Sequence, residues 1–219
     1  MGEAELQIIS HKLVIHSVIF FYGEAATSEL SWKIANDISM HWNEPNATIQ
    51  IKGNWFDVLF DIDGIYEPDL DPEKVWYNDN PRFNFFRIEE FASGNISFVD
   101  GIGSNTGYFM LDNLLQTSTT AAHEYGHTIG LDHPQNLDIR GKAAPGIMYP
   151  RGTLCDPAFQ YDPQVKAGDK GGTLNPFHRK VLPADIQDLK LHRLLFTNGR
   201  AVVGDFSSLY HEKHTPVVT

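Results

Sequence analysis

The eleven residues from 123 to 133 constrain this chain more than any other stretch, because they read His-Glu-Tyr-Gly-His-Thr-Ile-Gly-Leu-Asp-His. Residues four apart share one face of a helix, so His123 and His127 can direct two imidazoles at a single metal ion. Gly130 can adopt the left-handed conformation that ends a helix, which lets the chain turn and bring back His133 as a third ligand. Three histidines with one open coordination position are typical of catalytic zinc, whereas structural zinc usually has four protein ligands.

A second motif follows in residues 145–150, which read Pro-Gly-Ile-Met-Tyr-Pro. Met148 lies 15 residues after His133, in a turn flanked by glycine and proline. Alone, this methionine would indicate ordinary core packing, and a bare His-Glu-x-x-His would indicate a surface helix with two ordinary histidines. Together, the extended histidine motif and the methionine turn resemble the metzincin metallopeptidase pattern.

Within the metzincins, the chain most resembles the matrixin type. Matrixins typically carry H-E-x-G-H-x-x-G-L-x-H followed by Met-Tyr-Pro, and Gly126 and Leu131 stand in the corresponding places here. Pro134 after His133 is more similar to a serralysin. Serralysins and astacins, however, place a tyrosine ligand two positions after the methionine, where this chain has Pro150, which cannot ligate a metal. We therefore expect a three-histidine site and leave the subfamily open.

The resemblance implies a zinc-dependent endopeptidase with one catalytic Zn²⁺ held by the three histidines. Bound zinc lowers the pKa of its water to about 7. Glu124 would be the general base that accepts the water proton and passes it to the leaving amine. Met148 is expected to pack beneath the histidines, where Met148→Leu should be mild, and Tyr149 is expected to border a substrate pocket.

The resemblance also implies an extended polypeptide substrate that adds a strand to the sheet edge. The expected edge is residues 101–111, for which a plain surface hairpin is the alternative. The loop of residues 151–182 is expected to shape the pocket next to the cleaved bond. By resemblance, that pocket should prefer an apolar residue.

Apolar periodicity along the chain predicts an α+β fold. The expected strands are residues 13–22, 48–52, 55–66, 83–91, 96–99 and 108–111, with loops at 67–81 and 101–107. The expected helices are residues 24–42, a metal-binding helix capped by Thr117 or Ser118 and ending near Leu131, and residues 185–196. The resemblance arranges these elements as a twisted mixed sheet with one long helix, the zinc helix, the Met-turn and a C-terminal helix.

We expect one catalytic domain over residues 1–219, because no repeat or low-complexity tract divides the chain. Its upper part would be residues 1–133 and its lower part residues 134–219, with a cleft between them. Residues 134–181 are rich in proline and glycine, so little regular structure is predicted there. Residues 200–219 suggest no function.

Composition narrows the possible partners and compartments. The chain is 42% hydrophobic, which is enough for a packed core, and its net charge of −11 argues against nucleic acid or an anionic membrane as the main partner. No apolar run reaches the roughly 18 residues of a membrane span, and no signal peptide opens the chain. An intracellular protein or an excised domain of a secreted precursor would fit, and the early strand-like sequence favours the secreted domain.

One cysteine and four carboxylates are further candidates for metal binding, and each has a simpler interpretation. Cys155 is the only cysteine, so no internal disulfide can form, and its thiolate could occupy the open zinc position, although an inert or surface thiol is the simpler interpretation. Four carboxylates could support Ca²⁺, although solvated turn residues are the simpler interpretation. They are Asp61, Asp63, Asp100 and Asp112.

Two other functions are open at this point. The chain could be a catalytically silent zinc-binding or interaction module, although the presence of Glu124 beside all three histidines weighs against it. It could instead be the protease toxin domain of a larger secreted polypeptide. In that case an inhibitor, a pro-segment or an immunity protein would be an additional partner.

Overall fold

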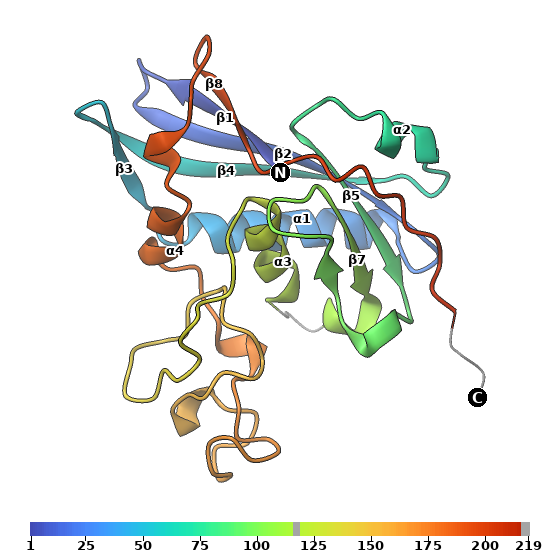
Figure 1. Cartoon of the computed structure of the whole chain (residues 1–219), viewed down its shortest axis with the longest axis vertical. Coiled ribbons are helices and arrows are strands. Elements are labelled where there is room, and N and C mark those ends of the chain that lie inside the picture. The colour runs from blue at the N-terminus through green and yellow to red at the C-terminus, as the bar shows by residue number, and fades with distance from the viewer. Residues whose placement is uncertain (116–118, 216–219) are drawn as a thin grey trace.

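The computed structural model describes residues 1–115 and 119–215. Its centre is a mixed, eight-stranded sheet with the main strand order β3-β4-β2-β5-β7-β6 (Figure 1). Strands β2, β4, β5 and β7 run parallel, and the edge strands β3 and β6 are antiparallel to their neighbours. The strands are β1 (Gly2–Gln7), β2 (Lys12–Tyr22), β3 (Thr48–Ile51), β4 (Asn54–Tyr66), β5 (Phe83–Glu89), β6 (Phe98–Val99), β7 (Thr106–Met110) and β8 (Arg200–Val203).

A few helices accompany this mixed sheet, so the chain has an α+β fold. They are α1 (Ser28–Asn43), α2 (Pro72–Trp76), α3 (Thr120–Thr128) and α4 (Pro183–Asp188), with 3₁₀ turns at Ser93–Asn95, Leu111–Asn113, Pro157–Phe159, Pro176–His178 and Leu191–Arg193. Among the described residues, no helix is both long and apolar enough to cross a membrane. The capping residues predicted for α3, Thr117 and Ser118, lie outside the described part of the chain.

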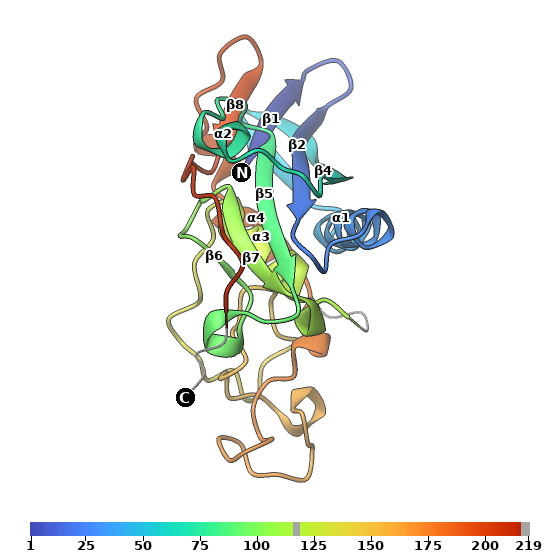
Figure 2. The ribbon, with the colours of Figure 1, turned by 90° about the vertical axis from the view of Figure 1, so that its right-hand side faces the viewer.

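Helix α1 lies along one face of the sheet (Figure 2). Thr27 caps it by accepting a hydrogen bond from the Leu30 backbone N–H at 3.1 Å. The apolar positions Ile34, Ile38 and Trp42 recur at helical spacing, as predicted, and all three are buried. Burying each such side chain stabilises the fold by roughly 1.5–3 kcal/mol, so this face determines where α1 docks.

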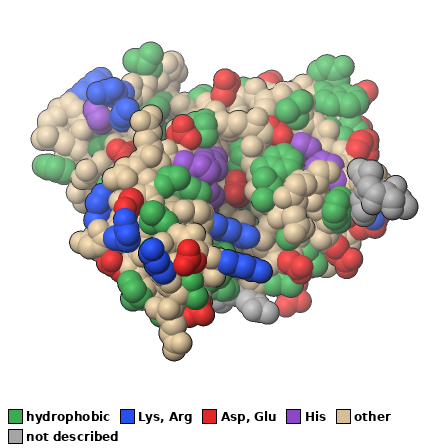
Figure 3. Space-filling model, turned by 60° about the horizontal axis from the view of Figure 1, so that its bottom comes forward, with side chains coloured by type: hydrophobic (Ala, Val, Ile, Leu, Met, Phe, Trp, Pro, Cys, Tyr) green, Lys and Arg blue, Asp and Glu red, His purple; other side chains and the backbone are tan. Residues whose placement is uncertain are grey.

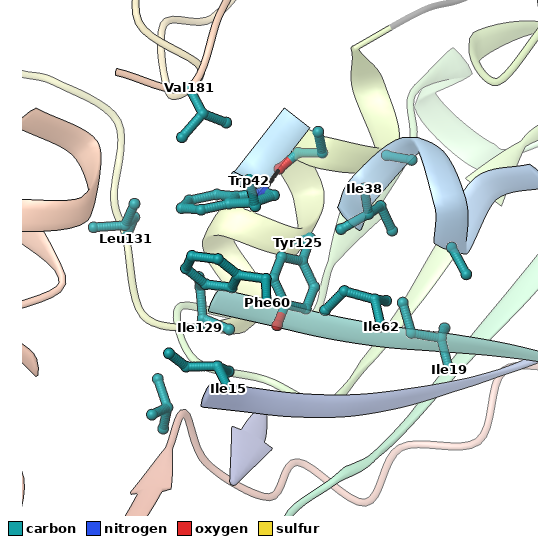
Figure 4. Packing of buried hydrophobic residues seen from close by; sticks show 14 of the residues in the cluster. Ile15, Ile19, Ile38, Trp42, Phe60, Ile62, Tyr125, Ile129, Leu131 and Val181 are labelled. Atoms are coloured by element: carbon teal, nitrogen blue, oxygen red, sulfur yellow. Dashed lines mark hydrogen bonds between the residues drawn. The ribbon is translucent and has the colours of Figure 1, made fainter. Parts of the chain in front are cut away.

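The back of α3 is held in the same core (Figure 4). The Trp42 indole N–H donates to the Ala122 carbonyl at 3.0 Å, and the Trp42 and Tyr125 rings meet edge to face at 5.8 Å. The Tyr125 hydroxyl is 2.9 Å from the Ser17 hydroxyl of β2. Tyr125 therefore points into the core, whereas His123, Glu124 and His127 of the same buried helix line cavities.

Residues 134–181 have little regular structure, as predicted (Figure 1). They pack around their own small cluster of Ile139, Cys155 and Leu174. Cys155 is fully buried there, and burial raises the pKa of its thiol. Among the described residues, the side chains placed to hold a metal are three histidines, and Cys155 is not with them. Its burial and raised pKa make it an inert buried thiol rather than a surface one.

Several predicted elements are wrong in extent. The C-terminal helix ends at Asp188 instead of 196, because Lys190 adopts a left-handed conformation with φ of 51°. Helix α3 ends at Thr128 rather than Leu131. The short helix α2 interrupts the predicted 67–81 loop.

The terminal segments form structure that was not predicted. Strands β1 and β8 pair with each other, and β1 also pairs with β2. Beyond β8 the chain returns across the sheet, where Tyr210 stacks on Tyr22 at 5.2 Å and His214 stacks on Tyr108 at 4.1 Å. Residues 200–215 therefore complete the sheet and cover part of it.

Candidate metal centre

The three predicted histidines meet at one point. Helix α3 presents His123 and His127, and the chain then turns at Gly130, whose φ of +102° is left-handed. This turn brings the Nε2 atom of His133 to 3.1 Å from the Nε2 atoms of both other histidines. In tetrahedral coordination with Zn–N bonds of about 2.0–2.1 Å, ligand nitrogens lie about 3.3 Å apart. The arrangement therefore fits a zinc ion.

Hydrogen bonds on the far sides of two rings set their orientation. His123 Nδ1 donates to the Ile147 carbonyl at 2.7 Å, and His127 Nδ1 donates to the Leu131 carbonyl at 2.7 Å. A carbonyl can only accept, so the proton of each neutral ring lies on Nδ1 and the lone pair lies on Nε2. Both Nε2 lone pairs point at the same place, which is the chemistry of a metal ligand set.

Burial also keeps these imidazoles neutral. It lowers the pKa of His123 well below its ordinary value, and the positive charge of Arg179 lowers it further. Burial lowers the pKa of His127 and of His133 as well. Because metal binding requires neutral imidazole, the folded chain holds its ligands in the binding form.

Glu124 lies beside His123 and is only 7% exposed. Burial raises the pKa of its carboxyl to about 8, against the opposing charges of Arg179 and Arg151. A divalent cation in the triad would lower this pKa, because a nearby positive charge favours the carboxylate. Without metal the Glu124 carboxyl therefore holds a proton near neutral pH, and a bound cation would favour the carboxylate that can accept one.

The methionine turn supports the triad from below. Its Ile147 carbonyl accepts the His123 bond, and Met148 is 3% exposed. The carboxylate of Asp185, from α4, accepts hydrogen bonds from the backbone N–H groups of Leu182 and Ile147. Burial raises the pKa of Asp185 to about 6, against those two bonds. Helix α4 therefore anchors the turn that orients His123.

Gly126 is required by the close approach of Met148 to α3. A Cβ atom at position 126 would lie 2.3 Å from the Met148 Sδ atom. In an open helix, Gly→Ala would stabilise by roughly 0.5–1 kcal/mol. At position 126 the clash with Met148 makes the same substitution destabilising, so Gly126 is needed for Met148 to pack against α3.

We expect Gly126→Ala to lower the free energy of unfolding by about 1–3 kcal/mol, because overpacking forces the turn away from the helix. Met148→Leu should cost less than about 1.5 kcal/mol. Urea unfolding of Gly126→Ala, Met148→Ala and the double variant measures the coupling, and removing the methionine should relieve most of the alanine's penalty. Additive effects, or a stabilising Gly126→Ala, would contradict this packing.

Two cavities of about 320 Å³ each flank the triad. Residues 96 and 97 line both cavities, and one of them continues beneath β6 to Ile102. The sheet ends at β6 on this side. The predicted edge at residues 101–111 is therefore wrong for β7, which pairs with both β5 and β6, although residues 101 and 102 line one cavity. Figure 3 shows this face, on which histidine side chains gather with Lys or Arg side chains close by.

The other sequence predictions have mixed outcomes. Tyr149 packs against the Cys155 cluster and does not line either cavity, although its carbonyl accepts a hydrogen bond from Arg179. Among the described residues, the histidine triad is the group placed to hold an ion, and the four candidate calcium carboxylates are not part of it. Asp61 instead contacts His16, and Asp100 contacts His211.

Sequence reasoning missed two residues of the cavity that contains Glu124. These are Arg151 and Arg179, which lie in the irregular segment of residues 134–181. The predicted pocket loop, residues 151–182, contains both of them. Their charge alone does not identify them, because the chain has 17 Lys and Arg residues.

No protein-family model matches this chain, and no curated protein matches it. Solved structures that it resembles include one titled "Structure of myroilysin", at 11% sequence identity. The match covers 88% of this chain and 100% of the other, with a TM-score of 0.38. A likeness of this degree carries no functional argument, so the function has to be inferred from the geometry of the site.

Proposed function

We propose that this chain is a zinc-dependent endopeptidase. The observation that carries the proposal is the convergence of three imidazole Nε2 atoms, with His133 Nε2 at 3.1 Å from the other two, beside a buried Glu124. The three ligand atoms lie within 4.8 Å of one another. Three protein ligands leave a coordination position open, which favours catalysis over a purely structural metal.

Zn²⁺ bound to the triad would supply a Lewis acid for the scissile carbonyl and make water a better nucleophile at neutral pH. Glu124 would accept the proton of the attacking water, and it would then donate that proton to the amine as the peptide bond breaks. The Ile147 and Leu131 carbonyls hold the histidine rings in place throughout.

The substrate would bind as an extended strand along β6. Edge strands present unpaired backbone N–H and C=O groups, which an extended peptide can satisfy. Residues 96–99, 101 and 102 line the same cavity as the triad and Glu124, so a peptide paired along β6 would run past Glu124. This arrangement favours cleavage within a chain.

The alternative is a module that binds zinc without hydrolysing anything, and a chelation experiment separates the two. The purified protein is incubated with casein and with a quenched peptide, before and after removal of metal by a chelator and after return of one equivalent of Zn²⁺. We expect cleavage to stop on chelation and to return with zinc. Stoichiometric zinc without cleavage of either substrate would favour the silent module.

A further inference from the structure

Two guanidinium groups lie at the cavity beside Glu124, and the acceptors that they contact within residues 1–115 and 119–215 are neutral. Arg179 is 4% exposed; its Nε donates to the Thr119 hydroxyl at 2.9 Å and its Nη1 to the Tyr149 carbonyl at 3.2 Å. Arg151 Nη2 donates to the Asn113 side-chain oxygen at 2.8 Å. In the described part of the chain, no carboxylate oxygen lies within 4.0 Å of a guanidinium nitrogen of Arg151 or Arg179.

This arrangement is costly for the chain alone. A buried cation with no carboxylate in direct contact loses hydration that neutral hydrogen bonds restore only in part. Burial lowers the pKa of Arg179 to about 10; the charge of Glu124 opposes this shift, and the neighbouring charge of Arg151 adds to it. The two cations therefore repel each other at the wall of an open cavity, where a bound anion would relieve both costs.

We infer that this cavity receives a carboxylate from the substrate residue next to the cleaved bond, an inference that rests on the proposed endopeptidase function. The cavity volume of about 320 Å³ accommodates an acidic side chain. Ile96 and Pro150 line the same cavity and would contact its methylene groups. Guanidinium and carboxylate groups form strong, charge-assisted hydrogen bonds, so the preference differs from the apolar one that the matrixin resemblance suggests.

The carboxylate has two possible sources with the same chemistry. It can be the side chain of Asp or Glu beside the cleaved bond, or the C-terminal carboxylate of a short leaving segment. The first would make the enzyme an endopeptidase with an acidic preference. The second would make it trim chain ends.

The arginines could instead serve only Glu124, whose carboxylate both charges favour. In that case their loss would affect all substrates equally and shift the pH dependence of cleavage. Recognition of a substrate carboxylate makes a different prediction, because the loss would then depend on the substrate. The comparison between substrates therefore decides between the two roles.

The test uses quenched peptides that differ only in the residue before or after the cleaved bond, which is Glu, Gln, Leu or Lys. Each peptide is made with a free and with an amidated C-terminus. The enzymes are the wild type, Arg151→Gln and Arg151→Glu, because Arg151 is exposed and its substitution is tolerated better than that of buried Arg179. Arg140→Gln is the matched control, since Arg140 pairs with Asp138 on the surface and does not line the cavity.

For one of the two positions, wild-type kcat/KM should favour Glu over Gln by about 10- to 100-fold, the range expected for hydrogen bonds to a charged group. Arg151→Gln should remove most of that ratio, Arg151→Glu should shift the preference towards Lys, and Arg140→Gln should keep the wild-type ratio. If the C-terminus is the source, the same ratios should appear between free and amidated peptides.

Cleavage of all peptides with no preference for a carboxylate in either form would overturn this inference and leave the endopeptidase proposal intact. A preference for Leu that Arg151→Glu does not change would also overturn it. Failure of every enzyme to cleave any peptide, with zinc bound, would overturn both.

Discussion

Replacing Glu124 by Gln is expected to lower kcat for peptide cleavage by about 10²–10⁴-fold, the usual contribution of a general base, and to leave Zn²⁺ bound. Gln has the same shape but cannot accept the water proton. The three side chains that converge to hold an ion are histidines and do not include Glu124, so the metal site should persist. The measurements are kcat with a quenched peptide and zinc content after dialysis.

The same substitution should not weaken the fold. Burial raises the pKa of Glu124 to about 8, which means that the folded chain resists ionisation of this carboxyl. Removing the group therefore removes a cost that grows as the pH rises from the ordinary pKa of Glu towards about 8, above which it is fully present. Glu90→Gln is the control, because Glu90 is exposed and lines neither cavity beside the triad. Activity of Glu124→Gln near that of the control would exclude Glu124 as the base.

Replacing His127 by Ala is expected to abolish stoichiometric zinc binding and peptide cleavage together. The Nε2 atom of His127 lies 3.1 Å from His133 Nε2, as does that of His123. Without His127, only the other two histidines remain as ligands. Zinc that binds only the folded state stabilises it by about 2.7 kcal/mol when free zinc is about 100 times its Kd. The variant should therefore lose the zinc-dependent rise in melting temperature as well as its zinc.

Zinc content after dialysis and thermal unfolding with zinc or with a chelator check this result. His192→Ala is the matched control, since His192 is exposed and does not belong to the triad. It should keep the zinc stoichiometry and the zinc-dependent stabilisation of the wild type. Stoichiometric zinc in His127→Ala would show that the triad is not the binding site.

The candidate metal centre could be predicted from the sequence because its geometry is local. Three ligands fall within eleven residues, where helical spacing and the left-handed turn at Gly130 place the rings. The long helix α1 was accessible for a similar reason, since its apolar positions at Ile34, Ile38 and Trp42 mark one face. Both features depend on contacts between residues that are close in sequence.

Leucine spacing misled the prediction at the C-terminal helix. It favoured a helix to residue 196, yet α4 ends at Asp188 and Leu195 is 90% exposed. The anchoring of α4 to the methionine turn through Asp185 could not be inferred from this local pattern. The start of the short helix α2, by contrast, is indicated in the sequence by the capping residue Asp71 and by Pro72 in the first turn.

The sequence by itself determined the α+β character of the chain, its principal helix and the three histidines with Glu124, because short-range periodicity and spacing specify them. Only the tertiary structure decided the sheet edge over the triad, the β1 and β8 pairing, and the two arginines at the cavity. Those features join segments far apart along the chain. Their pairing depends on which surfaces pack together in the folded protein, and no local pattern of residues encodes it.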